Sequence, residues 1–144
     1  MSRLLLLSAC VAFAAGPVLF EDITARSGVA FRHQASKTAH KYLIESTTGG
    51  VAMLDYDGDG WLDLYFVNGA ELKNGMKAGE VPVKTDAKFF NRLYRNQHDG
   101  TFADVTEKAG VKGSVYDMGA TAADFDNDGD TDLYVTGFPR NTLY

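Results

Sequence analysis

Short apolar runs separated by polar turns set the pattern of this chain. After the first 15 residues, the runs are only four or five residues long and are rich in Val, Tyr, Phe and Thr. Runs of this length and composition are typical of β-strands. The predicted strands are residues 51–54, 64–67, 93–96, 101–105, 120–123 and 133–136. A helical period is confined to single turns near residues 24–27 and 106–109, so the pattern predicts an all-β fold.

Two features refine the predicted strands. Residues 51–54 and 120–123 are small and apolar throughout, so we expect strands that are buried on both faces. The Asp99-Gly100 pair stands between the strands predicted at residues 93–96 and 101–105. Asp-Gly between two such runs is a strong hairpin signal. We therefore expect these two strands to pair as a β-hairpin.

The strand pattern repeats along the chain. Residues 50–69 match residues 119–137, including an acidic stretch followed by Leu-Tyr, and Asn-x-Leu-Tyr occurs at 91–94 and 141–144. Repeats of this length are typical of propellers, solenoids and arrays. Four short antiparallel strands per repeat correspond to one blade of a β-propeller.

The repeat predicts an incomplete β-propeller of about one and a half four-stranded blades. Residues 16–144 would form its N-terminal part, with the first blade at about 50–106 and a truncated second blade at 119–144. Because propellers need roughly four to eight blades, we expect further blades in a longer protein. A polar insertion at about 70–90 separates the second and third strands of the first blade. It is either a partner-binding loop or, more simply, a tolerated surface insertion.

The first 15 residues have the pattern of a signal peptide. Arg3 precedes an apolar run that is too short to cross a bilayer, and cleavage is expected after Ala14 or Ala15. This predicts export to the periplasm, the cell surface or the medium. A lipoprotein box that ends at Cys10 and a buried N-terminal helix are the alternatives. Cys10 is the only cysteine, so a processed chain would have metal rather than disulfides as its cross-link.

Composition limits the classes of partner. The chain has 144 residues, 45% of them hydrophobic, and a formal net charge of −5. Its Lys and Arg residues are scattered, which argues against nucleic-acid binding. The acidity is concentrated instead in two nine-residue stretches, at 55–63 and 124–132.

These two acidic stretches predict calcium-binding loops. Each places Asp at its first, third, fifth and ninth positions, and carboxylates this close repel one another unless a cation lies between them. Ca²⁺ takes six to eight oxygen ligands. The predicted ligands are the carboxylates of Asp55, Asp57, Asp59 and Asp63 with the carbonyl of Trp61, and those of Asp124, Asp126, Asp128 and Asp132 with the carbonyl of Asp130. The alternative is a pair of acidic turns without metal.

The local backbone supports this interpretation, whereas the EF-hand pattern does not. Gly58, Gly60, Asn127 and Gly129 can adopt the positive φ that a tight wrap requires. An EF-hand needs Glu at the twelfth position and a helix on either side. The twelfth position falls instead inside a predicted strand. The loop is therefore expected to close on its ninth-position Asp.

Other candidate residues carry a weaker signal. His33, His40 and Glu45 fall in one polar stretch, which is either a second metal or ligand site or a solvated linker. Tyr42, Trp61, Tyr65 and Tyr94 are either sugar-stacking faces or core, and His98 is expected to be exposed at the hairpin tip. The chain has no recognisable catalytic motif, so we do not expect an enzyme.

The combined pattern resembles FG-GAP/VCBS repeats. The carrying motifs are Gly-Val-Ala-x-x-Asp-x-Asp-Gly-Asp-Gly-x-x-Asp-Leu-Tyr, then Asn-x-Leu-Tyr-Arg-Asn-x-x-Asp-Gly-Thr-Phe-x-Asp-Val-Thr. More narrowly, residues 20–144 are similar to the propeller of the ASPIC/UnbV, or cartilage acidic protein-like, family. The resemblance implies an exported, calcium-stabilised, integrin-α-like propeller of seven blades.

Two functions follow from the resemblance and the motifs together. The first is a non-catalytic extracellular module for adhesion or for binding a protein or carbohydrate partner. The alternative is the scaffold of an exported enzyme whose catalytic residues lie beyond residue 144.

Overall fold

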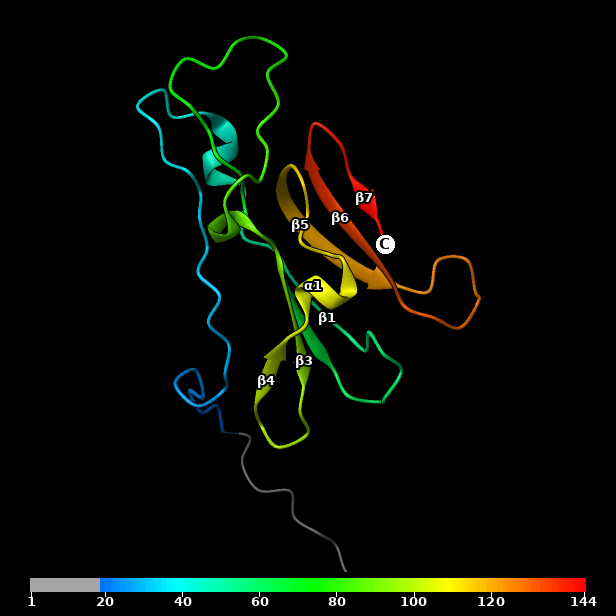
Figure 1. Ribbon diagram of the computed structural model, residues 1–144. Coiled ribbons are helices and arrows are strands. Elements are labelled where there is room, and N and C mark those ends of the chain that lie inside the picture. The colour runs from blue at the N-terminus through cyan, green and yellow to red at the C-terminus, as the bar shows by residue number, and fades with distance from the viewer. Residues whose placement is uncertain (1–18) are drawn as a thin grey trace, which may run out of the picture.

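Two antiparallel sheets make up the computed structural model, which describes residues 19–144 (Figure 1). The first sheet has the order β1-β2-β3-β4, and the second has the order β5-β6-β7. The strands of the first are β1 (Val51–Leu54), β2 (Asp63–Phe66), β3 (Arg92–Asn96) and β4 (Phe102–Asp104). Those of the second are β5 (Tyr116–Ala123), β6 (Asp132–Phe138) and β7 (Thr142–Leu143). The predicted all-β fold of blade-like sheets is confirmed. The predicted leader, with Cys10, lies outside the described residues.

The hydrophobic core lies between the two sheets. Ala52 and Leu54 of β1 pack there with side chains from β2, β3, β5 and β6. The expectation that residues 51–54 are buried on both faces is wrong, because Val51 and Met53 are 54% and 60% exposed. Within residues 19–144 only the face of β1 toward β5 is covered, and Val51 and Met53 lie on the other face. Residues 120–123 also alternate between half-buried and exposed positions.

Close contact between β1 and β5 depends on glycine. The Gly50 N–H donates to the Met118 carbonyl at 3.1 Å. A Cβ added to Gly50 would lie 2.6 Å from the Cα of Gly119, which no side chain tolerates. The two sheets therefore approach backbone to backbone at this point.

Residues 19–144 contain three short helical segments. α1 (Thr106–Ala109) follows β4 as predicted, and it ends at Gly110 with φ +73°. Two 3-10 turns, η1 (Leu43–Ser46) and η2 (Ala87–Phe89), were not predicted. Side-chain hydrogen bonds hold them, since Glu45 accepts from the Tyr42 N–H and Asp86 accepts from the Lys88 N–H. Segments of one turn leave no periodic signal in the sequence.

The insertion between β2 and β3 is anchored in the interior through Lys84, although most of its residues are exposed, as in a surface insertion. The Lys84 side chain is fully buried. Its ammonium donates to the carbonyls of Asn68, Gly69 and Phe89 at 2.5, 2.7 and 2.8 Å. The same ammonium lies 3.4 Å from a carboxylate oxygen of Asp117 in β5. Lys84 thus links the insertion to both sheets.

Candidate metal centre

Each acidic loop connects the first two strands of a sheet, and its first Asp organises the turn. Asp55 accepts hydrogen bonds from the N–H groups of Asp59 at 3.1 Å and Gly60 at 2.8 Å. Asp124 accepts from Asp128 at 3.2 Å and Gly129 at 3.1 Å. The first carboxylate of each loop therefore folds the chain back over itself in the same way.

The fifth and ninth positions also form equivalent bonds in the two loops. Asp59 accepts from the Trp61 N–H at 3.0 Å, and Asp128 accepts from the Asp130 N–H at 2.9 Å. At the ninth position, Asp63 accepts from the Tyr56 N–H at 3.0 Å. In the second loop, Asp132 accepts from the Phe125 N–H at 2.9 Å. Two loops far apart in sequence thus have one architecture.

Positive φ angles allow this tight wrap. Gly58 and Gly60 have φ of +71° and +87°, and Asn127 and Gly129 have φ of +62° and +98°. All four were expected to adopt this conformation, and that expectation is confirmed. Asn is the side chain that tolerates it best after Gly, which explains why loop two has Asn where loop one has Gly58.

Three carboxylates converge in each loop. Oxygens of Asp55, Asp57 and Asp63 lie within 4.8 Å of one another, as do oxygens of Asp124, Asp126 and Asp128. Calcium–oxygen distances of 2.3–2.6 Å put opposite ligands about 4.6–5.2 Å apart. One hard cation therefore fits each group.

The converging groups differ from the predicted ligand sets in one member each. Asp59 in loop one and Asp132 in loop two lie outside the groups of converging carboxylates. The carbonyls of Trp61 and Asp130 remain predicted ligands.

Two side chains from the β3–β4 hairpin, Arg95 and His98, account for the position of Asp59. Arg95 Nη2 lies 2.8 Å from Asp59 Oδ2, and His98 Nε2 lies 2.9 Å from the same oxygen. Arg95 Nε also lies 2.6 Å from Asp57 Oδ2. Burial raises the pKa of Asp59, but hydrogen bonds from the Trp61 N–H, His98 and Arg95 outweigh it, so this pKa lies below its usual value. Loop one thus has its own counter-charge.

Sequence analysis did not assign Arg95 or His98 to the site. The local pattern contained no signal for Arg95, because its position depends on the register of β2 and β3, which pairs Leu64 with Tyr94 across the insertion. That register places the next residue of β3 beside Asp63, where the acidic loop ends. His98 was expected to be exposed, and its side chain is 41% exposed while its ring stacks on Trp61 with centroids 4.8 Å apart.

Loop two has a different electrostatic environment. Within residues 19–144, no Lys, Arg or His forms an ion pair with Asp124, Asp126 or Asp128, all of which are exposed. Asp63 is fully buried, and its second oxygen accepts from the Asn96 N–H at 2.7 Å. Its counterpart Asp132 is only partly buried. Loop one is therefore the more enclosed and the better neutralised of the two.

The remaining candidates do not form a joint site. His33 Nε2 lies 3.1 Å from Thr48 Oγ1, whereas Glu45 is occupied by hydrogen bonds from Thr38 and Tyr42. His40 packs against the Tyr42 ring, with centroids 5.7 Å apart. In the described part of the chain, these residues are not among the groups placed to hold a metal.

The four aromatic candidates separate into core and surface. Tyr65 and Tyr94 are buried, at 0% and 3% exposure, so they belong to the core. The Tyr65 hydroxyl donates to the Val111 carbonyl at 2.9 Å, and burial raises the pKa of this phenol. Trp61 is half-exposed and lies in the acidic loop.

A comparison with protein families found a match that covers both acidic loops. A family model described as an FG-GAP-like repeat matches residues 55–135. The match begins at the first Asp of loop one and runs through loop two into β6, so it covers more than half of the chain. No curated protein and no solved structure matches. None of the helices within residues 19–144 has the length and apolar character needed to span a membrane.

Proposed function

The chain belongs to the FG-GAP-like repeat family, and on that basis we propose that it is a calcium-stabilised, non-catalytic binding module of a β-propeller. One observation carries the metal assignment. Both loops have the same carboxylate-to-backbone hydrogen bonds, and each brings three carboxylates within 4.8 Å. The second loop repeats every acidic position of the first. Without a bound cation, carboxylates this close would repel one another, which costs free energy of folding.

The ligand chemistry favours Ca²⁺ over other common ions. All converging atoms are carboxylate oxygens, whereas Zn²⁺ is usually held by His and Cys. Mg²⁺ requires near-ideal octahedral geometry at 2.0–2.1 Å, and Ca²⁺ accepts irregular, flexible sites. When bound, the ion would supply charge neutralisation. The carboxylates would then hold the end of one strand to the start of the next.

The wider role is proposed from the sequence pattern. We infer that residues 1–15 direct export, and that the chain belongs to the ASPIC/UnbV or cartilage acidic protein-like branch, with a seven-bladed ring. Its activity would be adhesion to an extracellular protein or carbohydrate. The exposed connections between strands, which are usual sites of binding residues, support a binding role.

Terbium luminescence provides a test that separates the two loops. Tb³⁺ replaces Ca²⁺ and is excited through a nearby indole, and the only tryptophan, Trp61, lies in loop one. Asp57→Asn should abolish the Trp-excited signal, whereas the matched variant Asp126→Asn should retain it. Calorimetric titration with Ca²⁺ should show the loss of one site in each variant. Unchanged stoichiometry in both variants would overturn the calcium assignment.

A further inference from the structure

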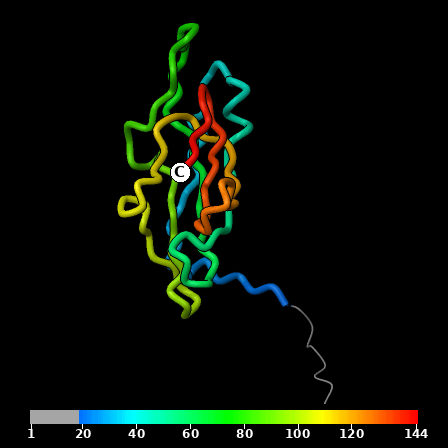
Figure 2. Tube along the Cα trace, turned by 90° about the vertical axis from the view of Figure 1, so that its right-hand side faces the viewer, coloured from blue at the N-terminus to red at the C-terminus, as the bar shows by residue number. Residues whose placement is uncertain are grey.

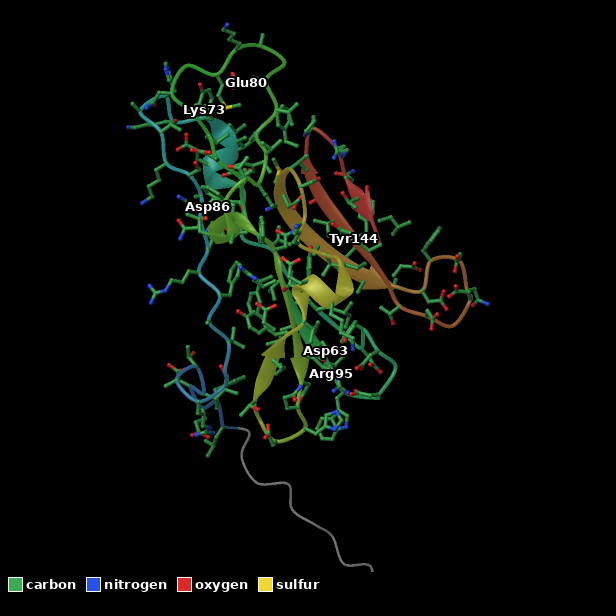
Figure 3. The ribbon with its side chains drawn as sticks, in the orientation of Figure 1. Asp63, Lys73, Glu80, Asp86, Arg95 and Tyr144 are labelled. Atoms are coloured by element: carbon green, nitrogen blue, oxygen red, sulfur yellow. The ribbon has the colours of Figure 1, made fainter. Side chains whose placement is uncertain are left out.

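The end of the molecule away from loop one carries a second surface. Residues 36–46 and 71–83, which we call the rim, lie together at the same end in both views (Figures 1 and 2). Lys73 and Glu80 mark this end, whereas Asp63 and Arg95 lie toward the opposite one (Figure 3). Antiparallel strands alternate in direction, so the connection after β1 and the connection after β2 lie at opposite ends of the sheet. Loop one follows β1, and residues 71–83 follow β2.

Hydrogen bonds between its two segments hold the rim in shape. The Leu72 N–H donates to Ser36 Oγ at 2.7 Å, and the Met76 N–H donates to the Tyr42 hydroxyl at 2.8 Å. Asn74 accepts from the Ala39 N–H at 2.8 Å. At its base the rim is fixed by a bridge between Val83 and Val115, next to the buried Lys84. A surface ordered in advance loses less conformational entropy when a partner binds.

The rim encloses an apolar hollow of about 300 Å³. Tyr42, Leu43, Ile44, Leu72, Met76 and Phe138 line it. Leu43 is 80% exposed at its edge, and Phe138 is 42% exposed. The volume is at the lower end of the range for ligand pockets. Exposed apolar surface of this kind, enclosed by polar residues, is typical of an interaction site.

The exposed charges on the two rim segments are mostly positive, although the hollow itself is lined by one charge of each sign, Lys77 and Glu80. Lys37, Lys41, Lys73 and Lys77 are exposed on the rim, in a chain whose net charge is −5. The Glu45 carboxylate is partly buried and accepts hydrogen bonds from Thr38 and Tyr42. Glu71 and Glu80 are the acidic side chains that remain exposed on these two segments. Charge complementarity therefore favours an acidic ligand.

We propose that the rim binds an acidic segment of a protein partner, which inserts one apolar side chain into this hollow. The inference rests on the proposed role as a binding module and names the partner class. A concave apolar site suits a single inserted side chain. An anionic membrane would instead require apolar residues that project from the surface. The lysines would attract the flanking carboxylates and set the orientation of the segment.

Fluorescence anisotropy with short labelled peptides tests the proposal on the full chain. The probes are peptides with Asp and Glu around one central Phe, and counterparts with Lys in place of the acids. The acidic peptides should bind, and binding should weaken as salt is raised. Leu43→Asp and the double variant Lys41→Glu/Lys77→Glu should each weaken binding about tenfold or more. Both sites are exposed, so the fold should persist.

The controls separate this proposal from its alternatives. Lys108→Glu, on α1, makes at one site the same charge reversal as each of the two rim lysine changes, and it should bind as the wild type does. Equal binding of acidic and basic peptides, or binding unchanged in the rim variants, would overturn the proposal. So would binding to phosphatidylserine vesicles in place of the peptides, or self-association that Leu43→Asp abolishes. Calcium titration of the same samples reports the metal sites independently, so either proposal can fail alone.

Discussion

Arg95 Nε lies 2.6 Å from Asp57 Oδ2, and this pair joins the β3–β4 hairpin to the first acidic loop. The second guanidinium contact, to Asp59, means that one cation bridges two of the four loop carboxylates and offsets one of their two charges. Hydrogen bonds to Asp57 and Asp59 raise the pKa of Arg95 further, so it stays charged at all ordinary pH values. In loop one, the protein and a metal ion would therefore share the task of neutralisation.

Removing this guanidinium should increase the dependence of the chain on calcium. Arg95→Gln leaves Asp57 and Asp59 without their cation, so repulsion within the loop should lower the melting temperature in EDTA by a few degrees. Saturating Ca²⁺ should then stabilise the variant more than the wild type. Differential scanning calorimetry with and without Ca²⁺ measures both effects.

The matched control is Arg26→Gln, which breaks an exposed ion pair with Glu21. Surface pairs of this kind contribute little, so its melting temperature should stay unchanged under both conditions. An Arg95→Gln variant that responds to Ca²⁺ no more than the wild type would contradict the shared role.

Asp63 should contribute to stability even without metal. Asp63→Ala removes the acceptor for the N–H groups of Tyr56 and Asn96 at a fully buried position. Leaving buried donors unpaired should lower the free energy of unfolding by about 1–3 kcal/mol. Urea denaturation in EDTA isolates this effect from metal binding. The matched variant Asp132→Ala removes one acceptor at a partly buried site, and an equal loss there would argue against burial as the cause.

Lys84 should be a major determinant of how the insertion holds the two sheets together. Lys84→Met leaves three carbonyls and the Asp117 carboxylate without their cation, which should lower the free energy of unfolding by about 3–5 kcal/mol. The double variant Lys84→Met/Asp117→Asn should lose less free energy of unfolding than the two single variants lose in sum, because the partners are coupled. The control Lys88→Met removes an exposed ammonium and should change stability by no more than about 0.5 kcal/mol. Additive losses of stability in this double-mutant cycle would refute the link between Lys84 and Asp117.

Lys84 should also shape the alkaline stability profile. Burial lowers its pKa to about 8 from 10.5, with the Asp117 charge acting in the opposite direction. Between pH 8 and pH 10.5, the Lys84 amine keeps its proton in the unfolded chain and has lost it in the folded chain. The free energy of unfolding should therefore gain a contribution that rises with pH from 8, by at most about 1.4 kcal/mol per unit. Above pH 10, ionisation of tyrosines such as Tyr116, whose folded pKa is raised to about 12, opposes it. Urea titrations of wild type and Lys84→Met from pH 7 to 9.5 should show this rise in the wild type alone.

The sequence by itself determined the local features of this protein. Strands, the hairpin at Asp99-Gly100 and the left-handed backbone at Gly58 and Asn127 each depend on residues within one short segment. The repeat identified the acidic loops as equivalent, since the same Asp spacing imposes the same turn. Single-turn segments such as η1 and η2 escaped prediction because one turn has no period.

The tertiary structure decided which side chains meet across the chain. Arg95 reaches Asp57 and Asp59 because the register of β2 and β3 places it beside the loop. Lys84 is buried because its ammonium reaches backbone carbonyls beside β2 and the Asp117 carboxylate in β5, although the composition of the insertion is that of a solvated loop. Val51 and Met53 are exposed because only the face of β1 toward β5 is covered, and a run of apolar residues does not reveal how many faces of its strand will be covered. Register, the packing of one sheet on another and the path of an insertion are set by long-range contacts, and a local pattern does not record them.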